Sequence, residues 1–301
     1  MATNNCKNQP TATSGKILQG QGVGTASNFS TATYPATVAS GDVITATSTN
    51  VVGSLVVPTN RWQVGSRLNY SGSAPAWMNF AKDIYIYDDW ISNASSGWLG
   101  WNTTNGGSAT ITVNDFVSTT VVGNVSLNTG TSSFSQAVIQ LGDTLHAMTF
   151  GGGRCVITWL AKLSRLSTSG ARYGTHIGYI NQGADYPTTT VSFYYEDSVN
   201  SGNWQLIAKD NSSTTTTNSS TAADTNWHKF TIDVNAGATS AEFFIDGTSL
   251  GTVTSNIPQA SGSTHTCQPG CFIANGSAAI STSSTLILDA MWMYQSQTNQ
   301  R

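Results

Sequence analysis

The sequence predicts an almost entirely β protein, and three observations support this. Only 9% of the 301 residues are charged, and the chain has just two glutamates, Glu196 and Glu242, so residues that favour helices are scarce. Nine tryptophans and ten tyrosines accompany many valines and threonines, which suit a pleated, half-buried surface. Short apolar runs recur between glycines, asparagines and serines, as they do in sandwiches and barrels.

The N-terminal part of the chain divides into an arm and a thin repeat. Residues 1–15 are small and polar without a period, and we expect a flexible or partner-ordered arm. Residues 16–82 form the next segment, and the stretches 15–29 and 65–80 share a layout that opens on glycine, turns at another glycine and closes on Asn-Phe. Two such units, about fifty residues apart, indicate a short repeat array. Units this thin cannot bury a core alone, so we expect them to pair with copies in other chains.

From residue 83 the pattern changes to apolar runs of strand length, which predict a sandwich domain over residues 83–301. Run 83–90 alternates isoleucine with tyrosine, and about eleven strands follow it. The one candidate helix lies around 158–166, but the β-branched residues at 156–158 and the lack of a helical stripe favour a strand over the run 154–166. The expected strands lie within 109–116, 118–127, 136–142, 154–166, 175–180, 190–197, 204–210, 228–234, 241–247, 271–276 and 284–295.

A three-stranded meander is expected between residues 225 and 252. The runs FTIDV (230–234) and FFIDG (243–247) each send alternate apolar residues to one face, and NAGAT (235–239) turns the chain between them. The dipeptide at 246–247, Asp-Gly, is a strong signal for a tight turn into a third strand. Trp227, at the start of the first strand, is expected to pack in the core or anchor its edge.

Composition excludes several classes of partner. The net charge is −3 and no basic run exists, which argues against nucleic acid, because phosphates need clustered lysine and arginine. No stretch of about 18 apolar residues is present, so we expect no membrane insertion. The N-terminus lacks the charged-then-apolar pattern of a signal peptide, so we expect another export route or release inside a particle on lysis.

The carboxylates do not predict catalysis. Glycoside hydrolysis usually needs two carboxylates ~5–10 Å apart. The two glutamates are far apart in sequence, and Glu196 is interpreted as a solvated hairpin residue, although an aspartate pair on another layout stays open. No phosphate-binding loop and no Gly-x-Ser-x-Gly elbow is present. We therefore expect no enzyme activity and no cofactor.

Metal sites are not predicted either. His265, Cys267 and Cys271 lie close together in sequence, but a fourth ligand at a standard zinc spacing is missing. A disulfide between Cys267 and Cys271, or two free thiols, is the expected state. Calcium binding through Asp88, Asp89 or Asp185 lacks the loop signature of hard-cation sites.

Three aromatic residues are candidates for ligand binding. Carbohydrate recognition uses aromatic faces against the C–H side of the sugar, with polar groups for the hydroxyls. Trp98 and Trp101 lie in the Gly/Asn-rich segment 96–107, and Tyr186 lies in the loop 181–187. The alternative places both tryptophans inside the sandwich, since buried tryptophan is the usual case.

The N-terminal pattern resembles a known kind of module. The runs "LQGQGVGTASNFSTATYP", "GDVITATSTNVVGSL" and "SGSAPAW" resemble shaft-like modules of bacteriophage tail-fibre and head-fibre proteins, over residues 17–80. Ser27 stands where proline is common in that pattern. The resemblance implies a homotrimer, a location in the virion, and contact with other phage virion proteins through residues 1–82.

The C-terminal part resembles the concanavalin A-like lectin/glucanase superfamily in its laminin-G-like form, over residues 83–296. Five positions fit its layout: Trp227, Asp246, Gly247, Pro258 and Asp289. The resemblance implies a two-sheet jelly-roll sandwich with a curved face. The Glu-x-Asp-x-x-Glu motif of the superfamily's glucanases is absent from this sequence.

Together these observations predict a phage virion appendage, a tail or head fibre or spike, that binds host-surface glycan by multivalent weak contacts. The first alternative is a capsid-decorating structural protein without specific glycan binding. The second is a spike that depolymerises polysaccharide.

Overall fold

The structure is a computed structural model, and the chain divides into two compact units, Met1–Ala81 and Lys82–Arg301. In the first unit the structure describes six short strands by their backbone. In the second it describes residues 83–89, 101–118, 121–142, 148–181, 186–259 and 265–296.

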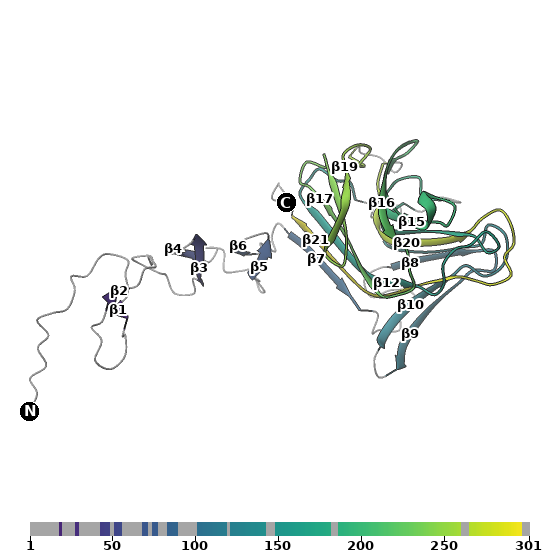
Figure 1. The fold of residues 1–301 in the computed structure, drawn as a ribbon, viewed down its shortest axis with the longest axis horizontal. Coiled ribbons are helices and arrows are strands. Elements are labelled where there is room, and N and C mark those ends of the chain that lie inside the picture. Colours follow the sequence, from purple (N-terminus) through teal and green to yellow (C-terminus); the bar gives the residue numbers. More distant parts are fainter. Residues whose placement is uncertain are drawn as a thin grey trace, which may run out of the picture. The chain divides into compact units, whose positions relative to one another are not determined.

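The described strands of the first unit form three two-stranded antiparallel hairpins (Figure 1). The first and third hairpins lie within the two similar sequence stretches, whereas the expected arm, residues 1–15, lies outside the described residues. An isolated hairpin is marginally stable in water, so these hairpins need further contacts. The pairs are β1 (Leu18–Gln19) with β2 (Asn28–Phe29), β3 (Val43–Ser48) with β4 (Val51–Leu55), and β5 (Leu68–Ser71) with β6 (Ala74–Trp77).

The second unit is a sandwich of two antiparallel sheets, which confirms the all-β prediction (Figure 1). The eight-stranded sheet has the order β19-β18-β17-β12-β21-β10-β9, and β7 also pairs with β21. Its strands are β7 (Asp83–Asp88), β9 (Thr110–Ser118), β10 (Val121–Asn128), β12 (Cys155–Leu163), β17 (His228–Val234), β18 (Ala241–Ile245), β19 (Thr248–Val253) and β21 (Thr285–Ser296).

The seven-stranded sheet has the order β16-β15-β14-β13-β20-β11-β8. A short 3₁₀ turn, Asn200–Gly202, precedes β15. The strands of this sheet are β8 (Trp101–Gly106), β11 (Gln136–Leu141), β13 (Tyr173–Ile180), β14 (Thr190–Tyr195), β15 (Asn203–Asp210), β16 (Ser213–Ala222) and β20 (Gln268–Asn275).

Aromatic side chains from both sheets meet in the core. Phe193 of β14 packs edge-on against Phe230 and Phe243, with ring centroids 5.2 and 5.1 Å apart, and Trp204 lies 4.9 Å from Phe230. All four are buried. Because burying one such side chain contributes about 2–3 kcal/mol, this cluster holds the two sheets together.

All the strands predicted for the second unit are present, and two further strands of this unit were missed. The strand over 154–166 and the meander over 225–252 are confirmed as β12 and as β17, β18 and β19. Trp227 is half-buried, with the Lys162 ammonium 4.9 Å from its ring centroid. The missed strands, β8 and β16, are the two polar edges of the seven-stranded sheet, and β8 lies within the Gly/Asn-rich segment 96–107.

The cysteines settle one alternative. Cys155, Cys267 and Cys271 are free and buried, so the disulfide between Cys267 and Cys271 is wrong and the free thiols are correct. The physical reason is strand geometry: four residues of extended chain span about 13 Å, whereas a disulfide needs Cα atoms within about 7 Å. In the described part of the chain, no helix has the length and apolar character needed to cross a membrane.

Candidate functional site

An aromatic group occupies the outer face of the seven-stranded sheet. The register places His176 of β13 directly opposite Tyr194 of β14 on one side and Phe272 of β20 on the other. Alternate residues of these strands, such as Ile177, point into the core, so these three point away from it. Tyr186, which precedes β14, completes the group. We call Tyr186, Tyr194, His176 and Phe272 the Tyr186 cluster.

Tyr186 covers its neighbours and is itself accessible. Its ring centroid lies 5.4 Å from that of Phe272 and 6.3 Å from that of His176, and His176 lies 4.7 Å from Tyr194. His176 and Phe272 are buried, whereas Tyr186 is 38% exposed. The cluster therefore presents one tyrosine to solvent on a packed aromatic base.

A glycine makes room for the two phenolic hydroxyls. A Cβ atom placed on Gly174 of β13 would lie 3.0 Å from the hydroxyl oxygen of Tyr194 and 3.3 Å from that of Tyr186. Both hydroxyls thus lie above the same point of the backbone. Any larger residue at position 174 would push them outward.

Charged groups form a rim beside the cluster. The Tyr194 hydroxyl donates to Oε2 of Glu196 at 2.7 Å, and Ser198 donates to the other carboxylate oxygen. The Nε of Arg172 lies 3.7 Å from Glu196 and donates to Asp197 at 3.0 Å. The Glu196 side chain is only 17% exposed, so its interpretation as a solvated hairpin residue is wrong. Its phenol and hydroxyl partners hold it against the sheet.

Burial fixes the protonation of the aromatic groups. It lowers the pKa of His176 to about 3, with a smaller contribution from the charge of Lys209, so the imidazole is neutral and Nδ1 hydrogen-bonds with the Ser192 hydroxyl at 2.9 Å. Burial, followed by the effect of Glu196, raises the pKa of Tyr194 and that of Tyr186. Both phenols therefore stay protonated and can donate hydrogen bonds.

The rim does not have the features of an acid–base pair. Burial raises the pKa of Asp197, but hydrogen bonds from Arg172 and Ser167 outweigh it, and the net pKa is lowered. Asp197 therefore stays ionised and cannot act as a general acid near neutral pH. Among the described residues, no group of three or more His, Cys, Asp or Glu side chains could hold a metal ion.

The three residues singled out from the sequence do not come together. Trp101 is buried on the inner side of β8, where its indole N–H donates to Asp88 at 2.7 Å and its ring lies 5.9 Å from that of Trp159. It occupies the interior position that the alternative interpretation gave it, and a buried ring offers no face to a ligand. Trp98 lies outside the described residues.

Sequence reasoning did not single out the partners of Tyr186. His176, Tyr194 and Phe272 lie in runs that were correctly predicted as strands, and their outward direction follows from the two-residue alternation. Their proximity depends on the pairing of β13 with β14 and β20, which no local pattern reveals. The alternation was therefore the one usable signal.

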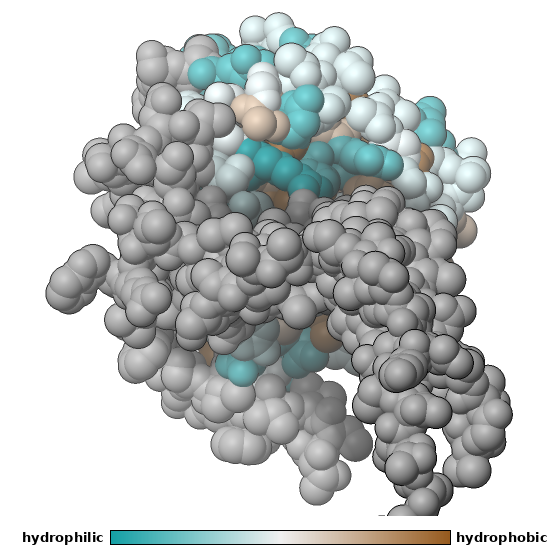
Figure 2. All heavy atoms as spheres, turned by 90° about the vertical axis from the view of Figure 1, so that its left-hand side faces the viewer, coloured by the Kyte–Doolittle hydropathy of each residue, from teal (hydrophilic) through white to brown (hydrophobic). Residues whose placement is uncertain are grey.

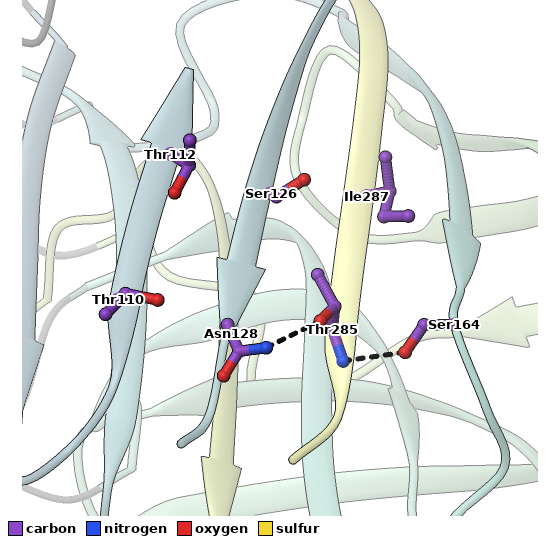
Figure 3. A pocket seen from close by; sticks show the side chains of 7 residues that line it. All are labelled: Thr110, Thr112, Ser126, Asn128, Ser164, Thr285 and Ile287. Carbon is purple, nitrogen blue, oxygen red and sulfur yellow. Dashed lines mark hydrogen bonds between the residues drawn. The ribbon is translucent and has the colours of Figure 1, made fainter. Parts of the chain in front are cut away.

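A hollow lies on the outer face of the eight-stranded sheet (Figure 3). It has a volume of about 360 Å³, and its walls carry small hydroxyls and one amide. Asn128 donates to the Thr285 hydroxyl, and the Thr285 amide donates to Ser164, each at 2.9 Å. No aromatic or charged side chain lines this hollow. The lining residues are Thr110, Thr112, Ser126, Asn128, Ser164, Thr285 and Ile287.

Comparisons with known proteins indicate the family and the fold. The family described as "SO2946-like, C-terminal domain" matches residues 120–289. A protein of unknown function, SO2946 from Shewanella oneidensis MR-1, has a similar structure with a TM-score of 0.53 and 16% identity, over 73% of this chain and 89% of that one. A search of the curated proteins gives no match.

Weaker structural similarities involve botulinum neurotoxins. One is the binding domain of neurotoxin DC in complex with rat synaptotagmin II, with a TM-score of 0.43 and 11% identity, over 67% of this chain and 45% of that one. Another is neurotoxin type C, whose cell entry depends on two ganglioside molecules, with a TM-score of 0.42, 10% identity and the same coverage. These structural similarities are too weak to support any inference about the ligand of this chain.

Proposed function

The chain belongs to the SO2946-like, C-terminal domain family, and on that premise we propose that its sandwich binds carbohydrate through the Tyr186 cluster. The observation that carries this proposal is the accessible Tyr186 ring on a buried aromatic base, next to the Glu196 and Arg172 rim.

The chemistry of the cluster matches a sugar. The ring of Tyr186 offers an apolar face for C–H groups, and its protonated hydroxyl can donate a hydrogen bond. The Tyr194 hydroxyl donates to Glu196, so its oxygen can accept a hydrogen bond from a sugar hydroxyl. The Glu196 carboxylate can accept from sugar hydroxyls, and Arg172, whose side chain is 42% exposed, can donate to them. A ligand with one apolar face and several hydroxyls would use all of these groups.

Binding without cleavage fits this arrangement better than hydrolysis does. Glu196 and Asp197 are sequence neighbours that share Arg172, and Asp197 stays ionised. A hydrolase would need one carboxyl group to be protonated on the opposite side of the scissile bond. The buried, neutral His176 is covered by Tyr186 and contributes packing to the base of the cluster.

The biological setting that we propose is the particle of a bacteriophage. The fibre-like pattern over residues 17–80 and the three thin hairpins of the first unit support an appendage that assembles as a homotrimer and contacts other virion proteins. Three copies would let weak glycan contacts add up to firm adhesion to a host surface. In Figure 2 the described part of this face is mostly white and teal with a few brown patches, and such a largely polar surface suits this role.

A glycan array of bacterial surface polysaccharides, probed with the full chain, tests the binding proposal. We expect Tyr186→Ala to weaken binding at least tenfold, since stacking of a sugar on an aromatic ring would be lost, and Gly174→Ala to weaken it by displacing both hydroxyls. Phe134→Ala is the matched control, because Phe134 is also an exposed aromatic residue, at 63%, and lies outside the cluster. Equal binding by Tyr186→Ala and the wild type would contradict the proposal.

The virion setting needs a separate test. Antibodies against the chain, applied to phage particles purified from a lysate of the source organism, should label an appendage in electron micrographs. Unlabelled particles from a lysate that contains the protein would reject this setting and leave the binding proposal standing.

A further inference from the structure

Four aromatic side chains form a strip on the outer face of the eight-stranded sheet. In the pairing of β7 with β21, Tyr87 lies opposite Trp292 and Tyr85 lies opposite Tyr294. Alternate residues of the two strands, Ile86 among them, pack against the core, so the four aromatic residues point outward. We call Tyr85, Tyr87, Trp292 and Tyr294 the aromatic strip.

The strip is accessible. Tyr85 is 43% exposed and Tyr87 is 52% exposed, and Trp292 and Tyr294 are half-buried beside them. Together with Tyr186, Tyr85 and Tyr87 are the exposed tyrosines of the described residues. The two strands β7 and β21 therefore present adjacent aromatic rings to solvent.

Polar and charged groups lie beside the Trp292–Tyr87 pair of the strip. The Lys229 ammonium lies 5.6 Å from the ring centroid of Trp292. Thr158 of β12 pairs with Trp292 on the side away from β7, and its hydroxyl shares a hydrogen bond of 2.9 Å with the hydroxyl of Thr231. At Tyr87, which pairs with Trp292, partial burial and then the charges of Asp89 and Asp289 raise the pKa, so the phenol stays protonated.

This border disfavours a large protein partner. A stable protein interface buries about 800 Å² on each side, with few charges at its centre. The strip is two strands wide, the Lys229 ammonium lies 5.6 Å from the ring centroid of Trp292, and the charges of Asp89 and Asp289 act on the Tyr87 phenol. Narrow aromatic surfaces edged with hydrogen-bonding groups suit a ligand that alternates apolar faces and hydroxyls.

We infer that the aromatic strip is a second carbohydrate-binding surface, which takes an extended, neutral polysaccharide chain with flat sugar rings. An extended chain can lay successive rings along neighbouring side chains of a flat strip. An acidic chain would be repelled by the negative charges of Asp89 and Asp289, which act on the Tyr87 phenol. This surface and the Tyr186 cluster lie on the outer faces of different sheets, so each can bind without the other.

Affinity electrophoresis of the full chain, in gels with and without hydroxyethylcellulose, tests the inference. We expect the polysaccharide to retard the wild type, and we expect Tyr85→Ala/Tyr87→Ala to bind at least tenfold more weakly. The exposed positions of both residues should leave the fold intact, and circular dichroism checks this. Tyr85→Phe/Tyr87→Phe keeps the rings and should keep most of the retardation. Phe134→Ala removes an exposed aromatic ring that lies outside both surfaces, and it should behave as the wild type does.

Three outcomes would overturn the inference. They are an unretarded wild type, equal retardation of the Tyr85→Ala/Tyr87→Ala variant, and a fall in the molecular mass of that variant in light scattering. The last would identify the strip as a contact between protein chains.

Discussion

His228 is the residue whose charge depends most directly on its neighbours in the β17–β19 meander. Its Nδ1 lies 2.6 Å from Asp246 and its Nε2 lies 2.9 Å from Asp224, so both ring nitrogens face carboxylates. Partial burial lowers the pKa of His228, but the hydrogen bonds and charges of the two aspartates outweigh it, and the net pKa is raised. The pKa values of Asp224 and Asp246 are lowered in return. The imidazolium form thus joins the turn at Asp246 to the segment before β17.

This triad predicts a pH dependence of stability. Because its folded pKa is raised, His228 stabilises the fold fully below its unfolded pKa of about 6.5, and this contribution is lost as the pH rises through the folded value. The aspartates contribute above about pH 3.9 and lose their contribution as the pH falls through their lowered values. We expect the free energy of unfolding of the wild type to fall by about 0.5–1 kcal/mol more than that of His228→Gln between about pH 5 and pH 8.5.

Urea unfolding at the two pH values measures this difference. Asp224→Asn/Asp246→Asn should remove the same dependence without changing the histidine. Parallel pH profiles of the wild type and His228→Gln would show that the triad does not couple protonation to folding.

At the scale of elements, the strands and the turns were predictable to different degrees. Strands with one buried face can be predicted from the alternation of apolar and polar residues, as β17 and β18 show. The edge strand β16 reads STTTTNSSTA and is mostly exposed, so no apolar residue marks its period. Edge strands can be this polar because only one side of each is paired, and charge or polarity there opposes edge-to-edge association.

The hairpin turn between β18 and β19 carries its own prediction. Asp246 and Gly247 both have positive φ, 51° and 82°, as a type I′ turn requires. No atom would obstruct a Cβ at position 247, so Gly247→Ala should cost about 1–2 kcal/mol through backbone conformation alone.

Thermal or urea unfolding of matched variants checks this expectation. Gly237 lies in the preceding turn, also has room for a Cβ, and does not have a left-handed φ, so Gly237→Ala should leave stability nearly unchanged. A similar loss of stability in both variants would show that the backbone angle is not the cause.

On the scale of the whole molecule, the two units differ in how they can be stabilised. The second unit has a continuous core between its sheets, whereas the described strands of the first form hairpins of two strands each. Hairpins of that size gain stability by packing against other surfaces. On this contrast we propose that the chain self-associates through its first unit.

Light scattering on the full chain and on residues 82–301 tests that placement. We expect the full chain to have the mass of three copies and the shortened chain the mass of one, because the hairpins would supply the contacts. A single-copy mass for both would rule out the homotrimer, and a trimer for both would move its contacts to the sandwich.

The candidate site was only partly predictable from the sequence. Tyr186 was singled out because it is an aromatic residue in a loop with glycine and proline. Trp101 had the same kind of neighbours, yet it is buried, because β8 joins the edge of a sheet and turns that ring inward. Composition does not reveal which side of a strand faces the core when the strand has a single large residue.

The sequence by itself determined the β class, most strands of the second unit and the Asp246–Gly247 turn, because alternation and turn chemistry act between near neighbours in the chain. Only the tertiary structure decided which outward residues meet. Tyr87 lies beside Trp292, and His176 lies between Tyr194 and Phe272, through pairings of strands that are distant in sequence. Both surfaces proposed to bind carbohydrate arise from such pairings, because strand register is set by the packing of the whole sandwich rather than by any local pattern.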